Sequence, residues 1–495
     1  MYEKLLKVVA NLGSPKVLVV GDFMLDVYVY GDALRISPEA PVPVLKVCRT
    51  DYGCGGAGSV AADVAALHGT AYCLGVIGND RNGEILMRLL GEAGVETGGL
   101  LVADDNRPTI SKQRLIGLAQ HRHRQQLMRM DQESSEPLSD AQYGKILESY
   151  EQLLAKADIV CLQDYNKGLL SEEICSQMIK LGRESGKSVL VDPCLTRDFS
   201  KYTGASCITP NRKEASAAVG FEITSADTAA SAAERLAETL HIEAVVITLD
   251  CDGAYLKTGQ VAEIVPTRPR SVYDVTGAGD TVLATLAVAL AAGVDHKTAV
   301  QLANIAGGIE VEKFGAATVT IEEIINEIIA DNRGKAGKVR ALDDLLHELK
   351  WRRTQNQTIV FTNGCFDVVH RGHIEFLKFC KGQGDIVVVG LNSDGSVKSI
   401  KGPQRPINNQ YDRAAVLAAM ESVDYIVVFD EPEPLNLVRK VRPDVLVKGR
   451  DWAEKGVVGR EFVESYGAKV VLAPLVEGKS SSSVIEKMKS LWKKF

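Results

Sequence analysis

The sequence predicts an α/β protein with two domains of unequal size, each built on a parallel sheet covered by helices. Short apolar runs alternate with helical stretches from the N-terminus onward. The alternation stops near residue 330 at a polar segment and begins again at residue 358. A chain of 495 residues also exceeds one ordinary domain, and its apolar content of 45% is typical of a globular protein.

Composition excludes several classes of function. The net charge of −7 leaves no basic excess for a nucleic-acid partner. The ten cysteines form no Cys-x-x-Cys pair and the eight histidines are scattered, so neither a zinc site nor a disulfide framework is indicated. The N-terminus is too polar for a signal peptide, and the apolar run 282–294 is too short to span a membrane. We therefore expect a cytoplasmic enzyme with no nucleic-acid or membrane partner.

Five runs in the first part of the chain are expected to be strands: 17–20, 72–77, 159–162, 188–191 and 244–248. Residues 21–26 close the first of them, where the small-ligand sites of open α/β sheets collect. The proline-rich stretch 38–43 cannot be a central strand or a helix interior, because proline lacks an N–H group. It suits an edge strand or a projecting lid.

Two segments of this part allow more than one interpretation. Residues 53–58 (Gly-Cys-Gly-Gly-Ala-Gly) formally match a dinucleotide pattern, but no clean strand precedes them. We interpret them as a turn that lets the backbone approach a substrate hydroxyl, ahead of a helix over 60–67. Arg107, Lys112 and Arg114 are three cations within eight residues, for which a solvated strand face is the simpler explanation.

Polar clusters follow three further strands. They are 164–168 (Asp-Tyr-Asn-Lys-Gly), Asp192 with Pro193, and 209–214 (Thr-Pro-Asn-Arg-Lys-Glu). Because the carboxyl ends of parallel strands meet at one edge of a sheet, we expect these clusters to line a single rim.

The strongest chemical signal is the stretch 274–281 (Asp-Val-Thr-Gly-Ala-Gly-Asp-Thr). Gly277, Ala278 and Gly279 leave backbone N–H groups uncovered where a buried helix begins, and the helix dipole favours an anion there. Asp280 is a carboxylate inside this anion site. It fits the removal of a proton from a hydroxyl that attacks a γ-phosphate. The alternative is a glycine-rich turn that caps a core helix.

With these motifs, residues 1–330 resemble the ribokinase-like sugar kinases, and the matching segments are 53–67, 209–214 and 275–281. The resemblance implies a ribokinase-like α/β kinase domain with a small β lid, in which Asp280 is the base and the amides of 277–279 form an anion hole. It implies that Asn211 and Glu214 serve the phosphates and magnesium of ATP, with Glu214 as the metal ligand. The sugar contacts would be Asp26, Gly55, Gly56 and Lys167. The family usually has Asn where this chain has Ser59.

The two halves are joined by a segment with a different composition. Residues 331–338 are polar and contain glycine, as linkers do, and a short amphipathic helix is predicted over 342–351. We therefore place a linker and bridging helix at 331–357. Residues 358–362 are again a strand, which opens a second domain over 358–495.

That strand runs into Asn363 and then into His370-Arg-Gly-His373. The two histidines are three residues apart at the entrance to a helix predicted over 374–380, so both rings can face one point beyond its N-terminus. Two imidazoles and a helix dipole suit a polyphosphate, and Gly372 allows its close approach. Zinc is the rival ligand, but no third ligand of suitable spacing follows.

Three later segments are polar: 401–405, 447–452 and 477–485. In the last, a serine run precedes a predicted terminal helix over 484–492, where hydroxyls and free amides form a phosphate cap; a flexible low-complexity patch is the alternative. Residues 358–495 resemble the His-x-Gly-His cytidylyltransferase-like nucleotidyltransferases, which have a smaller Rossmann-like fold. The resemblance implies that the nucleotide phosphates are positioned by Asn363, His370, His373, Lys401, Arg405, Ser480, Ser481 and Ser482.

A ribokinase-like half followed by this nucleotidyltransferase half resembles the bifunctional heptose kinase/adenylyltransferases of lipopolysaccharide-core precursor synthesis. The resemblance implies phosphorylation of D-glycero-β-D-manno-heptose 7-phosphate at C1, with Arg107, Lys112 and Arg114 holding the phosphate that the sugar already carries. It also implies adenylyl transfer from a second ATP to heptose 1-phosphate, after a separate bisphosphate phosphatase has acted. ATP and Mg²⁺ are the expected cofactors, with K⁺ as a further candidate, and we expect a homodimer through the kinase domain.

Two other functions fit parts of the pattern. A sugar kinase fused to a cytidylyltransferase for another sugar or polyol phosphate would keep every motif, and turnover of ATP against CTP separates the two. A pair of degenerate nucleotide-binding modules acting as a sensor is disfavoured, because Asp280, His370 and His373 are all present.

Overall fold

A computed structural model describes residues 2–118, 125–268, 276–313, 315 and 317–474. The chain divides into two compact units, a first unit over Glu3–Ile328 and a second unit over Ile329–Phe495. Each unit is described by itself. Among the described helices, none is both long and apolar enough to cross a bilayer.

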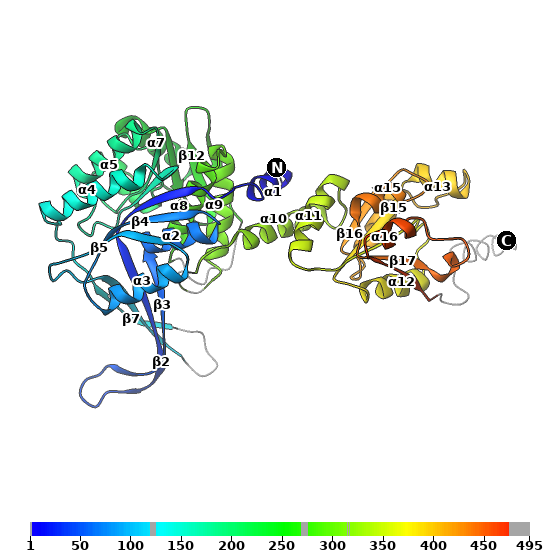
Figure 1. The fold of residues 1–495 in the computed structure, drawn as a ribbon, viewed down its shortest axis with the longest axis horizontal. Helices are drawn as coiled ribbons and strands as arrows, with labels where there is room; N and C mark the ends of the chain where they lie inside the picture. Colours follow the sequence, from blue (N-terminus) through cyan, green and yellow to red (C-terminus); the bar gives the residue numbers. More distant parts are fainter. Residues whose placement is uncertain (1, 119–124, 269–275, 314, 316, 475–495) are drawn as a thin grey trace. The chain divides into compact units, whose positions relative to one another are not determined.

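The first unit is built on a nine-stranded sheet with the order β13-β12-β11-β10-β9-β8-β1-β4-β5 (Figure 1). Its strands are β1 (Lys16–Gly21), β4 (Thr70–Ile77), β5 (Glu96–Val102), β8 (Ile159–Gln163), β9 (Ser188–Asp192), β10 (Cys207–Ile208), β11 (Ala244–Thr248), β12 (Ala254–Lys257) and β13 (Ala262–Val265). All five predicted strands are present, as β1, β4, β8, β9 and β11, and they run parallel. β12 and β13 add an antiparallel edge, because only a short connection, a single 3-10 turn at Asp250–Asp252 before β12 and a tight turn before β13, precedes each of them.

Helices cover both faces of this sheet. One face packs against α4 (Asp140–Leu154), α5 (Glu172–Glu184), α6 (Arg212–Val219) and α7 (Ala226–Leu240), which share one apolar core with it. The central strands also contact α2 (Ala57–Ala66) and α8 (Ala278–Ala291), which Figure 1 shows over the sheet. Helix α8 is buried from Asp280 to Ala289, which explains why it is apolar on every side. The unit also contains α1 (Tyr2–Val9), α3 (Arg81–Glu92) and α9 (His296–Glu310).

A second, four-stranded sheet, here called the lid sheet, has the order β3-β2-β6-β7. Its strands are β2 (Phe23–Ile36), β3 (Pro43–Gly56), β6 (Ile110–Gly117) and β7 (Gln125–Gln132). Figure 1 shows the long β2–β3 hairpin extending away from the main sheet, with the proline-rich stretch 38–43 at its tip. The prediction of a projecting lid is thereby confirmed. Only Asp22 separates β1 from β2, so Asp26 lies on a lid strand at the carboxyl edge of the main sheet.

The second unit has a five-stranded parallel sheet with the order β16-β15-β14-β17-β18. Its strands are β14 (Ile359–Gly364), β15 (Ile386–Asn392), β16 (Tyr425–Phe429), β17 (Val445–Gly449) and β18 (Lys469–Ala473). The described α-helices that follow β14 are α12 (Arg371–Lys381), α13 (Asp394–Lys401), α14 (Gln410–Ala418), α15 (Leu435–Val441) and α16 (Arg460–Ser465). The strands proceed outward from β14 to β16, and β17 then returns on the other side of β14. The crevice between β14 and β17 is therefore the switch point at which ligands of open α/β sheets bind.

The segment between the two halves is more structured than its composition indicates. Helix α10 (Ile321–Ala336) includes residues 331–336, because its hydrogen-bonded turns tolerate a single internal glycine. Helix α11 (Leu342–Thr354) contributes Leu345 and Leu349 to the core of the second unit. Arg340, just before it, forms a buried ion pair with Glu348, Nε to Oε1, at 2.7 Å. The predicted bridging helix is thus an integral part of the second unit.

Candidate active sites

The predicted anion site lies at the N-terminus of α8. Gly277 is the N-cap and has a φ of 94°, in the left-handed region that favours glycine. The N–H of Thr281 donates to the Gly277 carbonyl at 2.9 Å, which is the first hydrogen bond of the helix. The amides of Ala278, Gly279 and Asp280 precede it and have no acceptor within the helix. With the positive end of the helix dipole, they can stabilise charge on a phosphoryl group.

Asp280 lies in this first turn with only 4% of its surface exposed. Its Oδ1 accepts hydrogen bonds from the Gln163 amide at 2.7 Å and from the Tyr165 hydroxyl at 3.1 Å. Burial, followed by the nearby charge of Asp192, raises the pKa of Asp280 well above its ordinary value. A carboxylate with a raised pKa is a stronger base when ionised, and two donors hold it in one orientation. The arrangement suits the removal of a proton from a bound hydroxyl.

Gln163, Tyr165 and Asp192 belong to this site although the sequence alone does not assign them to it. The Gln163 amide also donates to Asp192 Oδ2 at 2.8 Å, so that one buried side chain bridges two carboxylates. Asp192 accepts a further hydrogen bond from the Thr209 hydroxyl at 2.9 Å. The sequence signal that could have identified these three residues is their position at or just after the ends of strands. Nothing in the local sequence indicates that Gln163 meets a carboxylate 117 residues further along the chain.

Asn211 and Glu214 form a reciprocal cap on α6. Asn211 Oδ1 accepts from the N–H groups of Lys213 and Glu214, while Glu214 Oε2 accepts from the Asn211 N–H at 2.8 Å. Burial and the charge of Asp192 raise the pKa of Glu214 to about 7, and burial raises the pKa of Asp192 to about 6. Neighbouring carboxylates that resist ionisation fit Mg²⁺, which takes one or two protein carboxylates and completes its shell with water and phosphate oxygens. No group of three or more metal-binding side chains occurs within the described ranges.

The predicted sugar contacts Asp26, Gly55 and Gly56 lie together. Asp26 is 3% exposed, and its Oδ1 pairs with the Arg114 Nη1 at 2.5 Å. A Cβ at Gly55 would lie 2.8 Å from Asp26 Oδ2, and one at Gly56 would lie 2.5 Å from the Asp22 carbonyl oxygen. Glycine at both positions therefore lets the backbone turn against the Asp26 carboxylate.

Lys112 lies two residues before Arg114, so both side chains are on the same face of β6. Its ammonium stands 4.6 Å from the centroid of the Tyr165 ring, and the hydroxyl of Tyr165 contacts Asp280. Burial lowers the pKa of Lys112, while the charges of Asp26 and Asp280 act in the opposite direction. A cation thus lies between the predicted sugar contacts and the predicted base.

Arg107 and Lys167 have other partners. The Arg107 guanidinium donates to the carbonyl oxygens of Glu136 (2.5 Å), Pro137 (3.1 Å) and Lys167 (3.3 Å). The Lys167 ammonium pairs with Glu133 Oε1 at 2.8 Å. Arg107 therefore ties two loops together, whereas the other two cations of its sequence cluster lie on β6.

In the second unit, His370 and His373 cap the N-terminus of α12, which begins at Arg371 rather than at residue 374. His370 Nδ1 accepts from the Gly372 N–H at 3.1 Å, and His373 Nδ1 accepts from the His370 N–H at 3.3 Å. The two ring centroids are 4.1 Å apart. Burial and the charges of His370 and Lys401 lower the pKa of His373 to about 4, so this ring is neutral at physiological pH. A neutral ring whose Nδ1 accepts carries its proton on Nε2 and can donate to a phosphate oxygen.

The remaining predicted phosphate contacts of this unit differ in their surroundings. Lys401 ends α13 close enough to His373 to lower its pKa. Arg405 Nη2 pairs with the buried carboxylate of Asp367, Oδ2, at 2.5 Å, so its orientation is set by that partner. Asn363 Oδ1 is buried and accepts no hydrogen bond from the described residues. Ser480, Ser481 and Ser482 lie outside the described residues.

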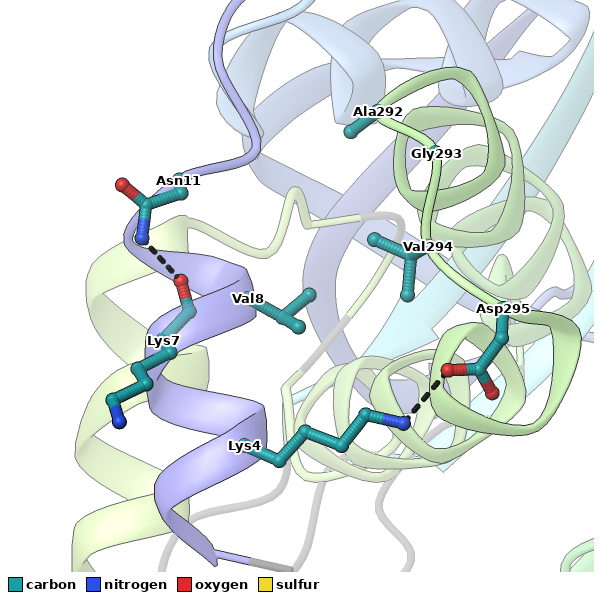
Figure 2. A pocket seen from close by; sticks show the side chains of 8 residues that line it. All are labelled: Lys4, Lys7, Val8, Asn11, Ala292, Gly293, Val294 and Asp295. Atoms are coloured by element: carbon teal, nitrogen blue, oxygen red, sulfur yellow. Dashed lines mark hydrogen bonds and ion pairs between the residues drawn. The ribbon is translucent and has the colours of Figure 1, made fainter.

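A hollow of about 620 Å³ lies between α1 and the turn Ala292–Asp295, away from all of these residues (Figure 2). Lys4 and Asp295 form an ion pair at its rim, Nζ to Oδ2, at 2.7 Å. Both side chains are more than half exposed, and such surface pairs contribute little. The hollow contains none of the predicted catalytic groups, so it is not the active site of the first unit.

The fold and the two sites define a class of protein, a carbohydrate kinase joined to a nucleotidyltransferase in one chain. The model of the pfkB family carbohydrate kinases matches residues 14–323, and the cytidylyltransferase-like model matches residues 361–487. The chain belongs to the pfkB family through its first unit, and as a whole it belongs to the family of bifunctional HldE proteins.

Relatives with that name match almost the full chain. The bifunctional protein HldE of Geobacter sulfurreducens is 42% identical over 97% of this chain and 96% of its own length. The HldE protein of Mesorhizobium japonicum is 42% identical over 99% of this chain and 97% of its own length. Both domains are therefore shared with these relatives in the same order.

Solved structures support the fold of the first unit. The tetrameric inhibited form of phosphofructokinase-2 from Escherichia coli superposes with a TM-score of 0.54 at 20% identity, over 64% of this chain and 99% of that chain. Arabidopsis thaliana ribokinase complexed with ribose and ATP superposes with a TM-score of 0.50 at 20% identity, over 64% and 99% of the two chains. The predicted ribokinase-like fold of the first unit is thereby confirmed.

Proposed function

We propose that the first unit transfers the γ-phosphoryl group of ATP to the C1 hydroxyl of D-glycero-β-D-manno-heptose 7-phosphate. The observation that carries the proposal is Asp280, a buried carboxylate with a raised pKa in the first turn of a helix whose first amides have no acceptor within the helix. Asp280 takes the proton of the C1 hydroxyl as that oxygen bonds to the γ-phosphorus and ADP leaves. The amides of Ala278, Gly279 and Asp280 stabilise the charge on the transferred group.

Three further groups fit this reaction. Asp192 and Glu214 have the chemistry to hold Mg²⁺, which neutralises phosphate charge when it is bound with ATP. Lys112 fits the 7-phosphate of the substrate, because it is a cation on β6 close enough to both Asp26 and Asp280 to feel their charges. K⁺ is a further candidate cofactor, and comparing kinase rates in potassium and sodium salts tests it.

The second unit then joins heptose 1-phosphate to AMP. A phosphate oxygen of heptose 1-phosphate attacks the α-phosphorus of ATP, and pyrophosphate leaves, so that ADP-heptose forms without a protein nucleophile. His370 and His373 at the N-terminus of α12 support a role in orienting the polyphosphate. Between the two steps a separate phosphatase removes the 7-phosphate. Both steps consume ATP, which is why we place the enzyme in the cytoplasm.

A coupled assay tests the proposed function. Heptose 7-phosphate and ATP should give heptose 1,7-bisphosphate and ADP, and adding a bisphosphate phosphatase should give ADP-heptose and pyrophosphate. The same assay with CTP in the second step addresses the alternative of a cytidylyltransferase. Faster turnover of CTP, or of another sugar or polyol phosphate, would contradict the proposal.

We also propose that the chain forms a homodimer through its kinase unit. The support is a set of apolar side chains that the lid sheet leaves in solvent: Val47 is 55% exposed, Met128 56% and Met130 44%. Covering them with a second copy removes apolar surface from water. Sedimentation of the full chain tests the proposal, and a monomer mass at micromolar concentration contradicts it.

A further inference from the structure

Lys448 is a buried lysine that neither reaction above uses. It lies near the carboxyl end of β17 and is 6% exposed. Its Nζ donates to the carbonyl oxygen of Asn363, at the end of the neighbouring strand β14, at 3.2 Å. The side chain therefore lies at the switch-point crevice of the second unit, where a ligand is expected.

The Lys448 ammonium makes fewer contacts than its three protons allow. Besides the Asn363 carbonyl it meets the face of Trp452, 5.0 Å from the ring centroid. No carboxylate in the described part of the chain forms an ion pair with it. Burial lowers the pKa of Lys448 to about 8, and the charges of Asp451 and Cys365 offset only part of this effect. An apolar side chain of similar length would be more stable there, so the charge requires another explanation.

A second unsatisfied group lies beside it. The side-chain oxygen of Asn363 is buried and accepts no hydrogen bond within the described residues. Buried polar atoms in native proteins nearly always have a partner, so a donor from a ligand fits this position. A cation and an acceptor at adjacent strand ends match the phosphate and a hydroxyl of a phosphosugar.

The alternation of β17 separates Lys448 from the histidines. Val447 packs in the core that includes α12, whereas Leu446 packs in the core on the opposite face of the sheet. Lys448 shares the direction of Leu446, because side chains alternate along a strand, and it therefore projects away from α12. His370 and His373 cap α12 itself. A ligand at the carboxyl edge of the sheet would therefore have Lys448 on one side and the two histidines on the other.

We propose that Lys448 binds the phosphate of the sugar phosphate that accepts the nucleotidyl group, with Asn363 Oδ1 accepting a sugar hydroxyl. This inference rests on the nucleotidyl transfer proposed for the second unit. In an in-line displacement, the attacking and leaving oxygens lie on opposite sides of the α-phosphorus. With pyrophosphate at the N-terminus of α12, the acceptor approaches from the face on which Lys448 lies. The new P–O bond forms as the bond to pyrophosphate breaks, so no further reactant is needed.

The test compares Lys448→Met, Lys448→Arg and, as a matched control, Lys455→Gln in the full-length enzyme. Lys455 is exposed and stands near the same ring, 6.0 Å from the Trp452 centroid. Lys448→Met should raise the KM for heptose 1-phosphate about tenfold or more, the cost of one charge-assisted hydrogen bond, and leave the KM for ATP unchanged. Lys448→Arg should recover most of the affinity, and Lys455→Gln should behave as the wild type.

Two further measurements separate binding from a structural role. Above about pH 8 the wild-type KM for heptose 1-phosphate should rise as the ammonium deprotonates, whereas Lys448→Arg should show no such rise. Lys448→Met should unfold at the same temperature as the wild type or higher. A lower unfolding temperature with an unchanged KM for heptose 1-phosphate would make Lys448 a structural residue and overturn the inference. A rise in the KM for ATP alone would also overturn it, by assigning Lys448 to the nucleotide. If the wild type makes no ADP-heptose at all, the proposed function itself is wrong.

Discussion

Asp280 joins three side chains from different strands and loops into one acid–base system. Gln163 donates to both Asp280 and Asp192, while Tyr165 donates to Asp280 alone. The pKa values of both carboxyl groups are raised, chiefly by burial. The amide thus holds two carboxylates close together that would otherwise repel each other when ionised.

The first prediction concerns Asp280→Asn. The amide keeps the shape of the side chain but cannot take a proton, so kcat for the kinase step should fall by roughly 10²–10⁴, or about 3–5 kcal/mol. Binding of ATP should change little, because the amides at the start of α8 remain. Steady-state kinetics and ATP titration measure the two effects. Near-normal kinase turnover in this variant would show that Asp280 is not the base.

The second prediction separates Lys112 from Arg107. Lys112→Gln should raise the KM for heptose 7-phosphate by roughly 10–100-fold, the worth of a charged hydrogen bond, and reduce the preference over unphosphorylated heptose. Arg107→Gln should leave the KM for heptose 7-phosphate and the preference for the phosphorylated sugar unchanged. It should lower the unfolding temperature, since Arg107 donates hydrogen bonds to loop carbonyls. A fall in kcat at constant KM in Lys112→Gln would instead assign Lys112 to the transferred phosphoryl group.

At the scale of secondary-structure elements, both active sites use helix N-termini whose caps are made by the predicted site residues. Asn211 and Glu214 cap α6, and His370 and His373 cap α12, each through a reciprocal pair of hydrogen bonds. A cap orients its side chains and consumes some of their hydrogen-bonding groups. In the proposed reactions the same residues would both stabilise the helix and offer their remaining atoms to the ligand.

The third prediction uses this double role. Asn211→Ala removes the acceptor for two backbone N–H groups and should cost about 1 kcal/mol of stability. Glu214→Gln keeps an acceptor for the Asn211 N–H but removes the charge, so it should raise the Mg²⁺ concentration needed for half-maximal kinase activity.

The pH dependence of stability gives Glu214→Gln a second readout. The folded pKa of about 7 lies above the ordinary value of 4.5, so ionised Glu214 destabilises the folded state, and the penalty grows as pH rises from 4.5 to 7. Glu214→Gln should therefore gain more in unfolding temperature at pH 8 than at pH 5. An unchanged Mg²⁺ requirement would contradict a role for Glu214 in holding the metal.

At the scale of the whole molecule, the two chemical centres belong to different compact units, with Asp280 in the first and His373 in the second. In the proposed reaction sequence the intermediate also passes through a separate phosphatase, which a sealed passage between the sites would prevent. We therefore expect the two sites to act independently and to exchange their intermediate through solution.

The fourth prediction tests this independence with two single variants. Asp280→Asn should fail in the first step but still adenylylate supplied heptose 1-phosphate. His373→Ala should do the reverse and accumulate phosphorylated sugar. Mixing the two variants with the phosphatase should restore ADP-heptose synthesis from heptose 7-phosphate and ATP. If each variant performs its remaining step but the mixture gives no product, free exchange is wrong.

Much of the architecture follows from local patterns in the sequence. Strands β1, β4, β8, β9 and β11 are buried on both faces, so each is a short, nearly continuous apolar run. The free amides at the N-terminus of α8 and the caps at Asn211 and His370 are equally local, because a helix begins within a few residues of the signal that starts it. Residues 331–336 are the exception, since helix α10 continues through a segment whose composition is that of a linker.

Local sequence patterns are enough to identify the chemically unusual residues: a carboxylate in a glycine-rich anion site, two histidines at a helix start, and cations near a strand. The partners of these residues become known only from the folded chain. It commits Arg107 to loop carbonyls, pairs Arg114 with Asp26, and brings Gln163 to Asp280 from 117 residues away. Periodicity and capping depend on neighbours along the chain, whereas ion pairs and pKa shifts depend on burial and on charges that only folding brings within a few ångströms.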